Sequence, residues 1–196
     1  TGGMWKWGCS GVGTGAPTAA NACSSPFATQ TLTLTATPSS IAVGGTSSIS
    51  ASSTSNLPPT VTLDTTADCT LSTPAGSTTV TATVTGVNAT GSCTVRASST
   101  VSADGCVSCY QAATPAMQAI TITKADQTIT FGVAPTTVVV DGTGTVSATA
   151  SSNLTVTFGT APNLICEVSG SGTVTGRKAG TCTVTGDQAG NGNFND

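Results

Sequence analysis

Residues 117–131, Met-Gln-Ala-Ile-Thr-Ile-Thr-Lys-Ala-Asp-Gln-Thr-Ile-Thr-Phe, decide how the rest of the chain is interpreted. They contain two runs in which apolar residues alternate with threonine, with Ala119, Ile120 and Ile122 in the first run and Ile129 and Phe131 in the second. Alternation with a period of two predicts β-strands. Only four residues, Lys124-Ala125-Asp126-Gln127, separate the runs. We therefore expect the last strand of one domain to lead almost directly into the first strand of the next.

The composition of the 196-residue chain favours an all-β fold. Threonine and valine are strand formers and are abundant, whereas the helix formers leucine, glutamate, lysine and glutamine are scarce. Short alternating runs separated by glycine and proline turns predict β-sandwiches. Aromatic residues make up only 4% of the chain, so each core is expected to bury little area and to need disulfides.

Several classes of function are disfavoured by what the sequence lacks. It has no histidine, which removes Ser–His and Cys–His nucleophile pairs and the usual zinc ligand. The net charge of −3, with five scattered basic residues, provides no patch for nucleic acid. No apolar run approaches the ~18 residues of a membrane span. We expect a non-enzymatic protein without a cofactor, and we interpret the start at Thr1 as processing or excision.

The second part of the sequence repeats the first at a constant offset of 97 residues. This offset places Leu34 on Phe131, Gly45 on Gly142, Asn56-Leu57 on Asn153-Leu154 and Cys69 on Cys166. Further on, Gly91-x-Cys93-x-Val95 matches Gly180-x-Cys182-x-Val184 at an offset of 89. Such regular identity indicates duplication. It predicts two sandwiches, over residues 30–123 and 124–196, after an N-terminal cap of residues 1–29.

Eight cysteines, an even number, indicate an oxidising compartment outside the cytoplasm. The duplication pairs Cys69 with Cys93 and Cys166 with Cys182, because these residues occupy equivalent places. Cys9 and Cys23 can close the loop of the N-terminal cap. Cys106-Val-Ser-Cys109 has redox spacing, but no predicted helix lowers a thiol pKa there, so a structural disulfide is favoured.

The N-terminal cap also holds both tryptophans, Trp5 and Trp7. In an extended Trp5-Lys6-Trp7, both rings face one side. They either cover the end of the first sandwich, as buried tryptophans commonly do, or form a platform for a sugar or another partner. The second interpretation gives the alternative function, a carbohydrate- or host-surface-binding module that uses these rings or the loops at a sandwich tip.

Four stretches of the second part resemble a bacterial immunoglobulin-like repeat. They are Lys124-Ala-Asp-Gln-Thr-Ile-Thr-Phe131, Gly142-Thr-Gly-Thr-Val-Ser-Ala-Thr-Ala150, Gly180-Thr-Cys-Thr-Val184 and Gly190-Asn-Gly-Asn-Phe194. The match covers residues 118–196 well and residues 30–117 more loosely. The resemblance implies immunoglobulin-like sandwiches in a large secreted or surface-anchored protein. It implies a role as stalk, adhesin module or filament subunit, whose partners are copies of itself or neighbouring repeats, or surface glycans.

The first copy continues past this last loop into the closing strand of residues 117–123, whereas the second copy reaches Asp196 without one. We expect the second sandwich to lack its closing strand and to expose an open edge. Either the strand lies further along a longer polypeptide, or another chain supplies it by β-augmentation.

An oxygen-rich run precedes Asp196 and is a candidate calcium site, although turn chemistry explains these residues equally well. Its members are Asp187, Asn191, Asn193, Asn195 and Asp196.

Overall fold

The computed structural model describes residues 28–65, 67–89, 91–99, 110–160 and 164–196, together with the backbone of β1 (Trp7–Gly8) and β2 (Ala22–Cys23). All regular secondary structure among these residues is β-strand, so the fold is all-β, as the composition predicts. Strands β1 and β2 pair antiparallel, with Gly8 opposite Ala22. No helix in the described part of the chain has the length and apolar character needed to cross a membrane.

The N-terminal half, residues 28–123, forms two four-stranded sheets in the described residues. One sheet has the order β3-β5-β8-β7 and the other the order β4-β10-β9-β6. The strands are β3 (Leu32–Thr37), β4 (Ser40–Ala42), β5 (Thr46–Ser53), β6 (Thr60–Leu63), β7 (Cys69–Leu71), β8 (Thr79–Gly86), β9 (Ser92–Ser98) and β10 (Ala116–Thr123).

Side chains that alternate along these strands fill one core between the two sheets. Ile49 of β5, Val84 of β8, Val95 of β9 and Ile120 of β10 are essentially inaccessible to solvent. The burial pattern of β10 directs Ile120 and Ile122 inward, but Ala119 faces solvent with the threonines. Ala119 therefore belongs to the outer face and not to the apolar row, because the strand period is two and it directly precedes Ile120.

The C-terminal half, residues 124–196, has shorter strands and a smaller core. Its described residues form sheets of order β11-β13, β12-β16-β15 and β14-β17. Val146, Cys166 and Val174 are buried, and Phe158, Val168, Cys182 and Val184 pack against them half-buried. The strands are β11 (Ile129–Phe131), β12 (Thr143–Thr145), β13 (Ala148–Ala150), β14 (Thr157–Thr160), β15 (Cys166–Val168), β16 (Thr173–Gly176) and β17 (Val184–Asp187).

A glutamine at the start of each half makes related hydrogen bonds, although Ser53 has no counterpart in the second half because the matching residue is Ala150. Gln30 is buried, and its Oε1 accepts hydrogen bonds from the hydroxyls of Ser53 and Ser55, both at 2.8 Å. Its Nε2 donates to the carbonyl oxygen of Gln111 at 2.7 Å. In the C-terminal half, 97 residues later, Gln127 accepts from the Ser152 hydroxyl and donates to the carbonyl oxygen of Asn195.

Candidate functional site: an open groove in the C-terminal half

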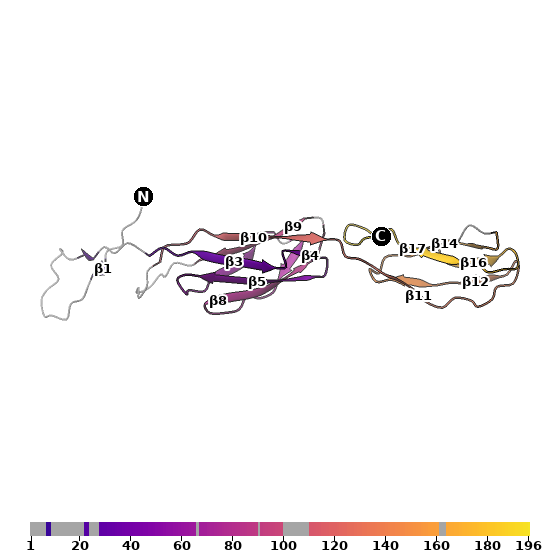
Figure 1. Ribbon diagram of the computed structural model, residues 1–196, viewed down its shortest axis with the longest axis horizontal. Coiled ribbons are helices and arrows are strands. Elements are labelled where there is room, and N and C mark those ends of the chain that lie inside the picture. The colour runs from indigo at the N-terminus through magenta and orange to yellow at the C-terminus, as the bar shows by residue number, and fades with distance from the viewer. Residues whose placement is uncertain are drawn as a thin grey trace.

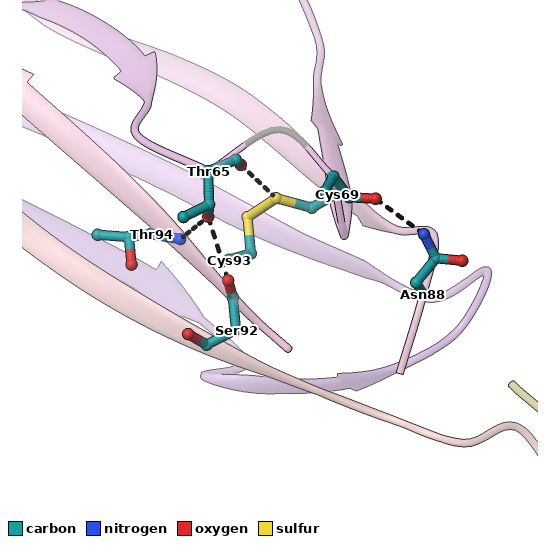
Figure 2. Close-up of a disulfide and its surroundings, with 7 residues drawn as sticks. Thr65, Cys69, Asn88, Ser92, Cys93 and Thr94 are labelled. Atoms are coloured by element: carbon teal, nitrogen blue, oxygen red, sulfur yellow. Dashed lines mark hydrogen bonds between the residues drawn. A yellow bond between two sulfur atoms is a disulfide. The ribbon is translucent and has the colours of Figure 1, made fainter. Parts of the chain in front are cut away.

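The structure contains both disulfides that the duplication predicts. Cys69–Cys93 joins β7 to β9, and therefore one sheet to the other, with a Cα–Cα distance of 5.8 Å. Figure 2 shows Thr65 beside this bond, where its hydroxyl donates to the carbonyl oxygen of Ser92 at 3.1 Å and accepts from the Thr94 amide at 3.0 Å. Cys166–Cys182 has a Cα–Cα distance of 5.7 Å.

Other predicted site residues fall outside what the structure describes. Trp5, Cys9, Cys106 and Cys109 lie outside the described residues, and only the backbone of Trp7 and Cys23 is described. The Cys9–Cys23 and Cys106–Cys109 pairings and the tryptophan platform stay predictions.

The oxygen-rich run before Asp196 is engaged in protein hydrogen bonds. Asn191 Oδ1 accepts from the backbone amides of Asn193 and Phe194, at 2.8 and 3.0 Å, and so shapes a turn. Asn195 Nδ2 donates to Asp126 Oδ1 at 2.8 Å. Within the described residues, no group of three or more histidine, cysteine, aspartate or glutamate side chains is placed to hold a metal ion. Calcium binding by Asp187, Asn191, Asn193 and Asp196 stays a prediction.

Asn193 has a role that sequence analysis missed, since it joins the two halves. Its Oδ1 accepts from the Ala89 amide at 3.0 Å, and its Nδ2 donates to Asn88 Oδ1 at 3.2 Å and to the Val87 carbonyl oxygen at 3.4 Å. These partners lie more than 100 residues away in sequence, so no local pattern signals the contact. Figure 1 shows the strands of the two halves end to end along the longest axis of the molecule, with the link after β10 between them.

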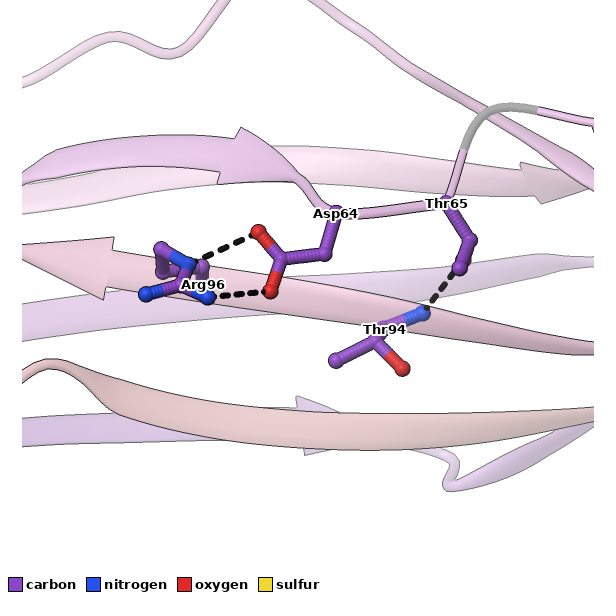
Figure 3. A network of polar contacts seen from close by, with 4 residues as sticks. All are labelled: Asp64, Thr65, Thr94 and Arg96. Carbon is purple, nitrogen blue, oxygen red and sulfur yellow. Dashed lines mark hydrogen bonds and ion pairs between the residues drawn. The ribbon is translucent and has the colours of Figure 1, made fainter.

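Two ion pairs in the described part of the chain connect neighbouring strands at the surface. Arg96 of β9 makes two hydrogen bonds to the Asp64 carboxylate, at 2.7 and 2.6 Å (Figure 3). The bond from the guanidinium holds the pKa of Asp64 below its usual value. Arg177 lowers the pKa of Glu167 in the same way, through a hydrogen bond of 2.6 Å.

The C-terminal half contains a groove of about 570 Å³. It is lined by residues from two segments, 131–138 and 178–184, and by the buried Val146, Cys166 and Val174 of the small core. Its remaining lining is largely aliphatic or hydroxyl-bearing, and Lys178 is the one charged residue among the described residues that line it. Apolar side chains around it reach solvent, because Phe131 is 46%, Val140 51% and Val139 76% exposed.

No protein-family model and no curated protein matches this chain. The proposed function therefore rests on the sequence and geometry of this chain alone. The groove combines aliphatic side chains with the hydroxyls of Thr136, Thr137 and Thr181 and a single charged residue, so it offers no cluster of acid, base or nucleophile among the described residues that line it.

Proposed function

We propose that this chain is a non-enzymatic structural component of an extracellular bacterial surface assembly. In this proposal the two halves are immunoglobulin-like sandwiches in tandem, and the chain serves as a stalk, an adhesin module or a filament subunit. Its partners are further copies of itself or neighbouring repeats. The alternative stays a carbohydrate- or host-surface-binding module that uses Trp5 and Trp7 or the loops at a sandwich tip.

The observation that carries the proposal is the way in which the two halves are joined. The link residue Ala125 donates to the Asn193 carbonyl oxygen and accepts from the Asn195 amide, both at 2.9 Å. Asn193 in turn bonds to residues 87–89 of the N-terminal half. A short link that is bonded on both sides favours a fixed extended arrangement, whereas unbonded linkers leave domains free to reorient.

The disulfides support an extracellular location. Cys69–Cys93 and Cys166–Cys182 each belong to a small core whose buried residues are all aliphatic or cysteine. Such cores depend on their cross-links, and disulfides persist in oxidising environments outside the cytoplasm.

Immunogold electron microscopy of the cells that produce the chain tests the proposal. We expect an antibody raised against the purified chain to label surface fibres or beaded rods on intact cells. A matched sample of permeabilised cells controls for access to the cytoplasm. Labelling that appears only after permeabilisation would overturn the proposed function.

A further inference from the structure

We propose that Asn153 is the attachment site of an N-linked glycan, and that the fold keeps the other candidate, Asn88, unmodified. Both residues begin an Asn-x-Thr triplet, the acceptor pattern for N-glycosylation, and no other Asn-x-Ser/Thr triplet occurs in the 196 residues. The pattern indicates a glycan in a secreted protein. The inference therefore rests on the extracellular location in the proposed function.

Asn153 lies in a turn that the fold holds in place. The turn follows β13, and the Asn153 amide donates to the carbonyl oxygen of Ala150 at 3.0 Å. The φ angle of Asn153 is 60°, a left-handed conformation that asparagine adopts more readily than most residues. Two hydrogen bonds fasten the turn to the start of this half, since the Ser151 amide donates to the Thr128 carbonyl oxygen at 2.9 Å and the Ser151 hydroxyl accepts from the Thr128 amide at 3.0 Å. The asparagine therefore has a defined place on the surface.

The side chains that N-glycosylation requires are accessible at this turn. Asn153 and Thr155 are both exposed. Among the described residues, no group forms a hydrogen bond with either side chain. Leu154 stands between them, and the pattern excludes only proline at that place. Asn153 Nδ2 is therefore free to receive a sugar, and the Thr155 hydroxyl is free to be recognised by a transferase.

Asn88 begins the same pattern but lies in a different environment. Its Nδ2, the atom to which a glycan attaches, donates to the carbonyl oxygen of Ala67 at 2.8 Å. Its Oδ1 accepts from Asn193 Nδ2 at 3.2 Å, and the residue is half-buried where the two halves meet. A glycan is bulky, so its attachment to this nitrogen would displace the Ala67 and Asn193 contacts. The folded chain therefore does not present Asn88 as an acceptor.

Asn56 provides a control for the turn alone. It lies 97 residues before Asn153, is exposed, has a φ angle of 59°, and donates from its amide to the Ser53 carbonyl oxygen at 3.1 Å. Pro58 stands where the second half has Thr155, so the hydroxyl of the pattern is missing. Asn56 therefore has the turn without the triplet, Asn88 has the triplet without a free amide, and Asn153 has both.

The transfer requires a donor and a transferase from the cells that produce the chain. The donor is a saccharide joined through its C1 to a diphosphate. A bond forms between Asn153 Nδ2 and C1 while the bond from C1 to the diphosphate oxygen breaks. The diphosphate leaves with the electron pair of that bond, and Nδ2 gives up one of its two protons to a base of the transferase. The product is a neutral amide that keeps one N–H.

Mass spectrometry of the chain isolated from its producing cells tests the inference. We expect peptides that contain Asn153 to carry a glycan, and peptides that contain Asn88 or Asn56 to carry none. Thr155→Ala should lose the glycan, whereas the matched variant Thr155→Ser should keep it, because serine retains the hydroxyl of the pattern. An unmodified Asn153 in the original chain, or a glycan that persists in Thr155→Ala, would overturn the inference.

The contribution of the fold is tested with chain made in a host that lacks N-glycosylation. This chain is incubated, either folded or reduced and alkylated, with membranes of the producing cells, which supply lipid-linked donors, or with their soluble fraction and nucleotide sugars. Folded chain should be modified at Asn153 alone, and unfolded chain at Asn88 as well. The fraction that supports the transfer identifies the donor. Modification of Asn88 in folded chain, its absence in unfolded chain, or no modification with either fraction would contradict the inference.

The outcome does not depend on the test of the proposed function. Immunogold labelling detects the chain at the surface whether or not Asn153 carries a glycan. Labelled fibres with an unmodified Asn153 would overturn this inference alone, whereas a chain detected only after permeabilisation would overturn the proposed function.

Discussion

The buried side chain of Gln30 links its own segment to the end of β5 and to residue 111 through hydrogen bonds. The two serine hydroxyls that donate to its Oε1 are themselves buried, as is the glutamine, of which 6% is exposed. Its amide nitrogen reaches residue 111, which is 81 positions away. Buried polar groups of this kind stabilise a fold only while every member keeps its partner.

Replacing Gln30 with alanine should destabilise the N-terminal half. The Ser53 and Ser55 hydroxyls would lose their common acceptor; they can still bond to each other at 2.8 Å, so one buried hydroxyl is left without an acceptor, which costs about 1–3 kcal/mol. Urea denaturation measures the loss. Gln111→Ala is the matched control, because the side chain of Gln111 is exposed and only its backbone joins the network. Equal effects of the two substitutions would contradict the role given to Gln30.

The surface ion pairs predict how stability depends on pH. The chain has no histidine, so stability should change little between about pH 5 and 8. Arg96 lowers the pKa of folded Asp64 below 3.8, and Arg177 lowers that of Glu167 below 4.5. A carboxylate whose pKa is lower in the folded than in the unfolded state stabilises the fold at pH values above its unfolded pKa. This stabilisation is lost as the pH falls through the folded pKa. The melting temperature should therefore drop below about pH 4.5, by a small amount because exposed pairs contribute little.

Calorimetric melting temperatures of Arg96→Gln and Arg177→Gln, measured from pH 7 to pH 3, test this assignment. Each variant should lose less stability on acidification than the original chain, since its carboxylate no longer has a partner to lose. Lys124→Gln serves as a control, because it removes one positive charge and leaves both ion pairs in place. A steeper fall in either arginine variant would refute the assignment.

At the scale of elements, the two disulfides support cores of unequal size. The N-terminal core contains Ile41, Ile49, Ile120 and Ile122 among its buried residues, but the C-terminal core buries no side chain larger than valine. The loops closed by the bonds span 24 and 16 residues. In the chain-entropy model each bond contributes about 3 kcal/mol, which is a larger share of the stability where the core is smaller.

Removing the bonds separately should therefore have different consequences. Cys166→Ala with Cys182→Ala should unfold the C-terminal half at ambient temperature, whereas Cys69→Ala with Cys93→Ala should leave a weakened but folded N-terminal half. Hydrogen exchange followed by mass spectrometry distinguishes the halves by peptide. If the amides of β16 stay protected from exchange after Cys166 and Cys182 are replaced, the small core is stable without its disulfide and the prediction is wrong.

Sequence patterns predicted strands better than they predicted their ends and contacts. Alternation located β3, β8 and β10, because a half-buried strand leaves a period of two in its sequence. Residues 142–150 also alternate, but they form two three-residue strands, β12 and β13. At the break, the Val146 amide bonds to the carbonyl oxygen of Gly172. A pairing partner on a distant turn leaves no periodic signal.

The candidate site could be predicted only in part, for the same reason. The duplication predicted the Cys69–Cys93 and Cys166–Cys182 bonds, because both pairings follow from aligning the two copies. The sequence did not predict that Asn193 bonds to residues 87–89 or that Gln30 bonds to Ser53, Ser55 and Gln111. Each acts on partners that only the folded chain brings near, and asparagine before a turn has an adequate local explanation.

At the scale of the whole molecule, the junction predicts a single orientation of the two halves. Residual dipolar couplings of the intact chain should fit one shared alignment tensor. Asn193→Ala removes the side-chain bonds to residues 87–89 and should separate the tensors. Asn195→Ala is the matched control, since its side chain bonds to Asp126 within the link. Two independent tensors in the original chain would contradict the fixed arrangement.

The parallel pairing of β4 with β10 has a consequence for a chain pulled by its ends. Tension that enters before β3 and leaves after Thr123 would slide these strands past one another, so bonds such as that between the Val43 amide and the Thr123 carbonyl oxygen would resist together. Once they gave way, Cys69–Cys93 would stop the 24-residue span between its cysteines from extending. At about 3.4 Å per residue, the disulfide would keep roughly 80 Å of contour length from extending. In a surface fibre built from such units, each unfolding event would therefore lengthen the fibre by less than it would without the disulfide.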